Sequence, residues 1–172
     1  MFLNDYPNQA PSVKFLTTGQ GQVRFNPNLY NCGKVCLSLL GTWSGPGWQP
    51  NKSTLLQVLV SIQGLVLVED PYFNEPGYET SRGTTDGTRL SNDYNKNIRR
   101  YTLQYAMLEP LKQLNNQENM HYQEFNHCMR QHFLENANAI KQQVVKWLEM
   151  DSSLEKIVEE TLSNLETLSE SA

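Results

Sequence analysis

The sequence predicts an α+β protein in which short extended segments precede a series of amphipathic helices. Up to residue 52, brief apolar segments alternate with turn-forming residues, which is typical of short strands joined by loops. From Ser53 onward, apolar residues recur every three or four positions, which is typical of helices. A chain of 172 residues with 38% apolar residues can bury a core as one domain of ordinary size, or as a domain with an extension.

The first extended segment covers residues 5–15, where Pro7 and Pro11 precede an alternation of Val13 and Phe15 that predicts one strand. Asn31-Cys32-Gly33 predicts a chain reversal, because asparagine tolerates left-handed backbone and glycine adopts it without a Cβ clash. An apolar run at 35–40 follows, which places Cys36 at the exit of a turn or on a brief strand. We therefore expect a thiol that is presented for attack.

The helical part of the chain begins with a run of apolar residues that share one helix face, capped by Ser53 or Thr54. These are Leu55, Val58, Leu59, Ile62, Leu65 and Val66. We expect a loop over 69–88, a helix from Asn92 that ends or kinks at Pro110, and a polar linker over 115–119. One or two further amphipathic helices and a final acidic one follow, with the apolar positions Phe125, Met129, Phe133, Ile140, Val144, Leu148, Leu154, Val158, Leu162, Leu165 and Leu168.

Charge and composition exclude several classes of function. The net charge of −4 argues against a general nucleic-acid binder. No apolar stretch is long enough to cross a membrane, and the first residues lack the apolar segment of a signal peptide. Three cysteines without a Cys-x-x-Cys pair fit reduced thiols rather than a disulfide framework. We expect a soluble protein of the cytoplasm or nucleus.

Residue chemistry alone leaves two interpretations of each candidate. Cys36 is either a nucleophile, able to hold a carboxyl group as a thioester, or a small buried apolar residue. Asn28 is either an oxyanion donor or a turn residue beside Pro27. Cys128 and His132, together with the histidines at 121 and 127, offer metal-ligand types, but their spacing is not a known zinc pattern and we expect this helix face to be packed, with no metal.

The segments RFNPNLY, GKVCLSLLGTW and EDPYFNEPGYE resemble the ubiquitin-conjugating enzymes, most closely the large hybrid members that also act as ligases, of the apollon type. Asn-Pro-Asn at 26–28 stands where that family usually has His-Pro-Asn, and Asn28 precedes Cys36 by the family's eight residues. Asn26 replaces the usual histidine, whose role is to brace the loop by hydrogen bonds, and an amide can make similar bonds.

The resemblance implies a fold in which an antiparallel meander packs on helices, here without its N-terminal helix and first strands. It implies a conjugating core over 1–114 and a helical extension over 115–172. Cys36 would carry ubiquitin as a thioester for transfer to a substrate lysine, supported by Asn28. Ser91, or alternatively Asp93, would position that lysine, although Asp93 and Asn92 equally suit the cap of the following helix. No bound cofactor is implied, since ATP is consumed by the partner activating enzyme.

Alternatives remain open at the level of partners and activity. Ubiquitin, its activating enzyme and substrate lysines are the implied partners. Trp43 and Trp48 lie where the family meets ligases, but equally suit the edge of the core. Transfer with built-in ligase activity and transfer with a separate ligase are both compatible with the sequence. The rival interpretation is a catalytically inactive or truncated binding module of the same fold.

Overall fold

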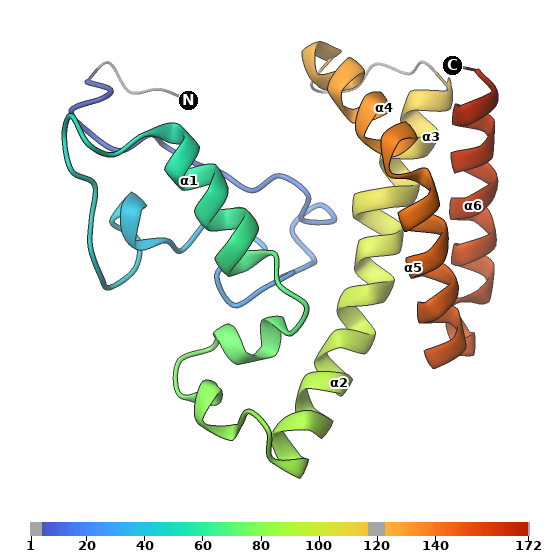
Figure 1. The fold of residues 1–172 in the computed structure, drawn as a ribbon, viewed down its shortest axis with the longest axis horizontal. Coiled ribbons are helices and arrows are strands. Elements are labelled where there is room, and N and C mark those ends of the chain that lie inside the picture. Colours follow the sequence, from blue (N-terminus) through green and yellow to red (C-terminus); the bar gives the residue numbers. More distant parts are fainter. Residues whose placement is uncertain (1–4, 117–122, 172) are drawn as a thin grey trace. The chain divides into compact units, whose positions relative to one another are not determined.

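A computed structural model describes residues 5–116 and 123–171. By backbone contacts it divides into an N-terminal unit, residues 1–95, and a C-terminal unit, residues 96–172 (Figure 1). Each unit has a cluster of buried apolar side chains of its own. The domain boundary expected after residue 114 stays a prediction.

Turns, bends and irregular backbone make up most of the first half of the N-terminal unit, and the described residues form no strand. Segments far apart in sequence meet at isolated antiparallel bridges, among them Lys14 with Lys34 and Leu29 with Val35. The strand predicted at Val13 and Phe15 is therefore wrong. Pairing cannot extend, because the turn at 31–33 lies on one side of Lys34 and a 3₁₀ helix, Ser38–Leu40, begins shortly after it.

Helix α1, Leu55–Ser61, begins where the sequence predicts. Thr54 caps it: its hydroxyl accepts from the Gln57 backbone N–H, and the Gln57 side chain accepts from the Thr54 N–H. The helix continues as a π-helical segment, Ile62–Val66. Val58 and Val66 are buried, but the predicted apolar face is only partly covered, because Leu59 and Leu65 are exposed. The π-helical hydrogen bonding changes the number of residues per turn, so a 3.6-residue pattern does not hold at Leu65, whereas Leu59 lies in α1, before this segment.

Two 3₁₀ helices, Pro71–Asn74 and Tyr78–Ser81, interrupt the predicted loop. Helix α2, Thr85–Tyr101, then starts seven residues earlier than predicted. The Thr84 hydroxyl accepts from the Gly87 N–H at 3.0 Å, and a Cβ at Gly87 would overlap the Ser81 carbonyl oxygen. The expectation that Asn92 or Asp93 caps this helix is wrong, since both lie in its interior.

Among the described residues of the C-terminal unit, five α- or π-helical segments follow α2. They are the π-helical segment Thr102–Leu108, α3 (Glu109–Asn116), α4 (Asn126–Glu135), α5 (Ala137–Met150) and α6 (Glu155–Glu170). A 3₁₀ turn, Gln123–Phe125, precedes α4, and another, Ser152–Leu154, joins α5 to α6. Pro110 does not end the helical run, which continues from α2 through the π-helical segment into α3, where Pro110 is the second residue. Residues 117–119 of the expected linker lie outside the described residues.

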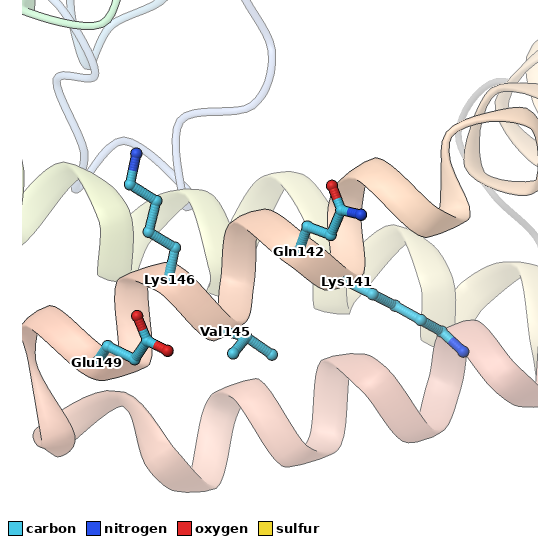
Figure 2. A pocket seen from close by; sticks show the side chains of 5 residues that line it. All are labelled: Lys141, Gln142, Val145, Lys146 and Glu149. Carbon is cyan, nitrogen blue, oxygen red and sulfur yellow. The ribbon is translucent and has the colours of Figure 1, made fainter.

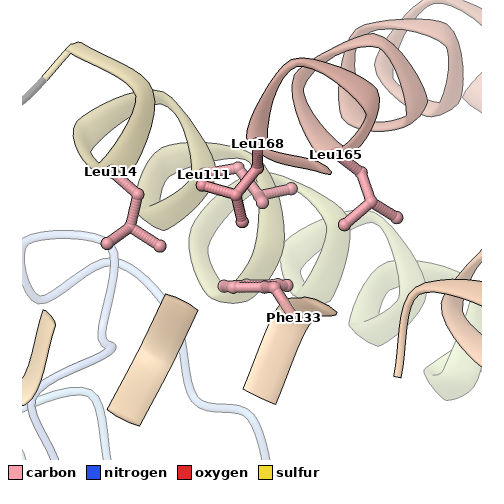
Figure 3. Close-up of a cluster of buried hydrophobic side chains, with 5 residues drawn as sticks. All are labelled: Leu111, Leu114, Phe133, Leu165 and Leu168. Carbon is pink, nitrogen blue, oxygen red and sulfur yellow. The ribbon is translucent and has the colours of Figure 1, made fainter. Parts of the chain in front are cut away.

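The core of this unit lies where α3, α4 and α6 meet. Leu111 and Leu114 face Phe133 and the α6 leucines Leu165 and Leu168 (Figure 3). A second cluster joins Leu103, Val144, Leu154 and Val158. Of the one or two amphipathic helices predicted here, the structure shows two, α4 and α5, and the last helix, α6, packs on its own unit.

The polar side of α4 differs from the prediction. His127, Cys128 and His132 are exposed rather than packed, because Phe133 and the half-buried Met129 supply the contacts of this helix with the core. His121 lies outside the described residues.

Candidate active site

The turn before Cys36 is built on Gly33. The Gly33 N–H donates to the Tyr30 carbonyl at 2.9 Å, and Gly33 has a φ of +88°. A Cβ there would come within 2.7 Å of the Phe15 carbonyl oxygen, so both conformation and space require glycine. This turn confirms the chain reversal predicted at 31–33. It brings Val35 back beside Leu29, and these two residues form a β-bridge.

Asn28 and Cys36, eight residues apart in sequence, are paired by two hydrogen bonds. The Cys36 N–H donates to the Asn28 carbonyl at 2.8 Å, and the Asn28 side-chain Nδ2 donates to the Cys36 carbonyl at 2.9 Å. Both polar backbone groups of Cys36 are thus held by one residue. This geometry is that of a loop support, and the amide retains a second N–H.

Asn26 supports the Asn-Pro-Asn loop by two hydrogen bonds of its side chain. It is 2% exposed, its Nδ2 donates to the Val66 carbonyl at 2.8 Å, and its Oδ1 accepts from the Asn28 N–H at 2.7 Å. The amide therefore connects the Asn28 turn to Val66, the last residue of the π-helical segment that follows α1. It makes the kind of loop-bracing hydrogen bonds expected at this position.

Thr42 contacts the residues on either side of Cys36, and sequence reasoning missed it. Its hydroxyl donates to the Val35 carbonyl at 2.6 Å and accepts from the Leu37 N–H at 3.0 Å. Nothing in a Gly-Thr-Trp segment indicates such a contact, because it depends on the path of the loop after Gly41.

Cys36 itself is buried. It is 1% exposed, whereas Cys32 and Cys128 are both exposed. The expectation of a presented thiol is therefore wrong for this conformation, since the apolar run to which Cys36 belongs packs inward, with Val35 and Leu37 also buried. A hollow of about 380 Å³ lies beside the segment and is lined in part by Val35 and Thr42.

Ser91 lies on α2 and is 3% exposed, and its hydroxyl donates to Asp70 Oδ1 at 3.2 Å. Asn95 donates to the same carboxylate oxygen at 3.3 Å. Asp93 is exposed and forms an ion pair with Arg89. The structure thus pairs Asn28 with Cys36 directly, and gives Ser91 a partner in Asp70.

Arg24 is a second residue that sequence reasoning missed. It donates to the Pro27 carbonyl at 2.6 Å, lies 4.5 Å from the centre of the Tyr30 ring and pairs with Glu75. Burial raises the pKa of Tyr94, an effect that the Arg24 charge opposes and the Glu75 charge reinforces. The Asn-Pro-Asn turn is therefore anchored to the segment that follows Pro71.

Comparison with known proteins decides the family. The family model described as ubiquitin-conjugating enzyme matches residues 1–102, which contain every residue of this site. The chain belongs to the ubiquitin-conjugating enzyme family. Members of this family are transferases that act through a cysteine thioester, and membership implies the family's fold, although the described residues are mostly helical.

Three relatives illustrate the match. The chain is 44% identical over 171 residues to a probable ubiquitin-conjugating enzyme of Acanthamoeba polyphaga mimivirus, covering 95% of this chain and 11% of that protein. It is 58% identical over 114 residues to a dual ubiquitin-conjugating enzyme and ubiquitin-protein ligase of Homo sapiens, covering 64% and 2%. It is 48% identical over 151 residues to a probable ubiquitin-conjugating enzyme of Caenorhabditis elegans, covering 86% and 20%. The chain thus spans a fifth or less of the length of these relatives.

A second hollow of this ubiquitin-conjugating family member, in its C-terminal unit, lacks comparable chemistry. This hollow of about 550 Å³ is lined by five residues of α5, including Lys141, Val145 and Lys146, with no thiol or hydroxyl among them (Figure 2). Over the described parts of the chain, no helix combines the length and the apolar character needed to cross a membrane.

Proposed function

We propose that this chain carries ubiquitin as a thioester on Cys36 and transfers it to a substrate lysine. The observation that supports the proposal is the pair of hydrogen bonds between Asn28 and Cys36, within the segment that matches the family. In the first step the Cys36 thiolate attacks the thioester that joins ubiquitin to the activating enzyme, and the activating enzyme's thiolate leaves. In the second, a lysine amine attacks, the Cys36 thiolate leaves, and the amine loses a proton.

Asn28 has two roles in this proposal. Its contacts keep the Cys36 backbone fixed, and the second N–H of its amide can donate to the oxyanion that forms when lysine attacks. One such donor is worth about 3 kcal/mol in other acyl-transfer enzymes. Ser91, or alternatively Asp93, would orient the lysine. Because the Ser91 hydroxyl is bound to Asp70, this role requires Ser91 to exchange partners.

Burial of Cys36 sets a condition on the mechanism. A residue that is 1% exposed cannot meet a protein-bound thioester until the side chains over it move. Thioester formation is thus proposed to follow a local opening of the 35–37 segment, which costs less free energy than unfolding of the unit.

The partners in this proposal are ubiquitin, its activating enzyme and proteins that supply lysines, in the cytoplasm or nucleus. No metal or organic cofactor takes part in either step, and ATP is consumed when the activating enzyme is charged. Transfer with a separate ligase and transfer without one remain alternatives. Residues 1–114 are proposed to act as the conjugating core, with 115–172 as a helical extension.

The test incubates the full chain with activating enzyme, ubiquitin and ATP, and resolves the products with and without thiol reductant. We expect an adduct that reductant removes and that is lost in Cys36→Ala. Cys32→Ala is the matched control, because Cys32 is an exposed thiol four residues away, and it should form the adduct like the native chain. An adduct that survives Cys36→Ala and disappears in Cys32→Ala would refute the assignment of Cys36.

A second candidate function is a binding module that holds partners without chemistry, and the burial of Cys36 favours it. This candidate predicts no adduct with either thiol intact and binding to a partner that is unchanged by Cys36→Ala. A reductant-sensitive adduct on Cys36 excludes it.

A further inference from the structure

The hydroxyl of Thr42 contacts backbone groups on both sides of Cys36. It donates to the carbonyl of Val35, the preceding residue, and accepts from the N–H of Leu37, the following residue, at 2.6 and 3.0 Å. Val35 and Leu37 are 3% and 7% exposed. Without the Thr42 hydroxyl, the Val35 carbonyl and the Leu37 N–H, which belong to buried residues, would lose these partners, which costs free energy.

Asn28 and Thr42 together form a clamp on residues 35–37. Asn28 holds the N–H and carbonyl of Cys36 itself, and Thr42 holds the adjacent carbonyl and N–H. Four consecutive backbone groups around the sulfur are thereby fixed by two residues. Because Cβ direction follows from the backbone, the clamp determines where the Cys36 side chain points.

The position of Thr42 is itself set by the loop. Gly41 has a φ of +67°, and its N–H donates to the Ser38 carbonyl at 2.9 Å. This left-handed residue turns the chain so that Thr42 returns to the 35–37 segment. A serine at position 42 could make both hydrogen bonds, whereas valine, which has the same shape as threonine, could make neither.

We propose that Thr42 is a positioning residue for Cys36: its hydroxyl closes the 35–37 segment over the buried thiol and sets the free energy of the local opening that exposes it. The clamp exists whether or not the chain is active. Its effect on ubiquitin transfer rests on the proposed function.

The first test measures alkylation of Cys36 by iodoacetamide in the full chain carrying Cys32→Ser and Cys128→Ser, so that Cys36 is the reacting thiol. Thr42→Val should raise the rate about tenfold, equal to about 1.4 kcal/mol. Thr42→Ser should stay within about threefold of the native residue, because it restores both hydrogen bonds. Ser44→Ala, which removes an exposed hydroxyl from the same loop, is the control and should leave the rate unchanged.

Urea separates positioning from stability in this experiment. Local opening exposes little surface, so the increase in Thr42→Val should be independent of urea at concentrations well below the unfolding midpoint. An increase with the same urea dependence as global unfolding would overturn the proposal, since Thr42 would then contribute only stability. Equal rates in Thr42→Val and Thr42→Ser would also overturn it.

A second test separates this proposal from the proposed function. Chains are first charged with ubiquitin to the same extent, and discharge to free lysine is then measured. Thr42→Val should lower kcat and leave KM for lysine unchanged. Thr42→Ser should restore kcat. If no variant forms a thioester while the alkylation rates differ as expected, the function fails and the clamp stands. If charging occurs and neither alkylation nor discharge depends on the hydroxyl, the clamp fails and the function stands.

Discussion

Replacement of Asn26 by alanine tests the network beneath the candidate site. The change removes a donor to the Val66 carbonyl and an acceptor for the Asn28 N–H, both at less than 2.9 Å, from a residue that is 2% exposed. A buried polar group without a partner costs about 1–3 kcal/mol. Two such groups, with partial relaxation, predict a loss of about 2–4 kcal/mol in the free energy of unfolding of the N-terminal unit.

The assay uses tryptophan fluorescence in urea. A Trp147→Phe background leaves Trp43 and Trp48, which both lie in the N-terminal unit, as the reporters. With a slope of about 2 kcal/mol per molar urea, the midpoint of Asn26→Ala should fall by about 1–2 M. The control Asn92→Ala removes an exposed amide from α2 and should stabilise by at most about 0.7 kcal/mol through helix propensity. An Asn26→Ala midpoint no lower than that of Asn92→Ala would refute the reasoning.

Three further predictions concern other parts of the chain. Phe133→Ala should lower the free energy of unfolding of the C-terminal unit by about 3–5 kcal/mol, measured by thermal melting, because the ring fills the core between α3, α4 and α6. The matched variant Phe125→Ala removes an exposed ring and should change the melting temperature little. Equal shifts in melting temperature for the two variants would contradict this packing. Thr84→Ala should lower the free energy of unfolding in urea by about 1 kcal/mol, because the Gly87 N–H in the first turn of α2 loses its hydrogen bond to the Thr84 hydroxyl. An unchanged free energy of unfolding would contradict the start of α2 at this position. Asp151 has a pKa lowered from 3.8, chiefly by the Ser153 hydroxyl, so its contribution to stability is present above pH 3.8 and is lost as pH falls through the folded pKa. The difference in urea midpoint between the native chain and Asp151→Asn should therefore shrink below about pH 4, and a difference that grows on acidification would contradict the sign.

The sequence was sufficient to predict features that depend on neighbouring residues. The turn at Gly33 and the cap at Thr54 follow from local chemistry, and the structure contains both. The proximity of Asn28 and Cys36 was predicted from a family motif, whose spacing reflects the bridge that returns Val35 to Leu29.

Features that depend on the path of a loop were not predictable in this way. The start of α2 is set by the approach of Gly87 to Ser81, which no helical periodicity records. The two hydrogen bonds of Thr42 arise because the loop after Gly41 folds back on the 35–37 segment, and Cys36 is buried because its apolar run packs inward. Local pattern predicts the turn at 31–33 but not the side chains that cover the segment after it.

The most direct measurement of the central claim locates the bond to ubiquitin. The Cys36→Ser chain is incubated with activating enzyme, ubiquitin and ATP, and the adduct is digested and mapped by mass spectrometry. An oxygen ester is stable to thiol reductant, so we expect a reductant-resistant adduct whose modified peptide carries the ubiquitin tail at position 36. An adduct mapped to a lysine or to another cysteine, or no adduct from a native chain under the same conditions, would contradict the account.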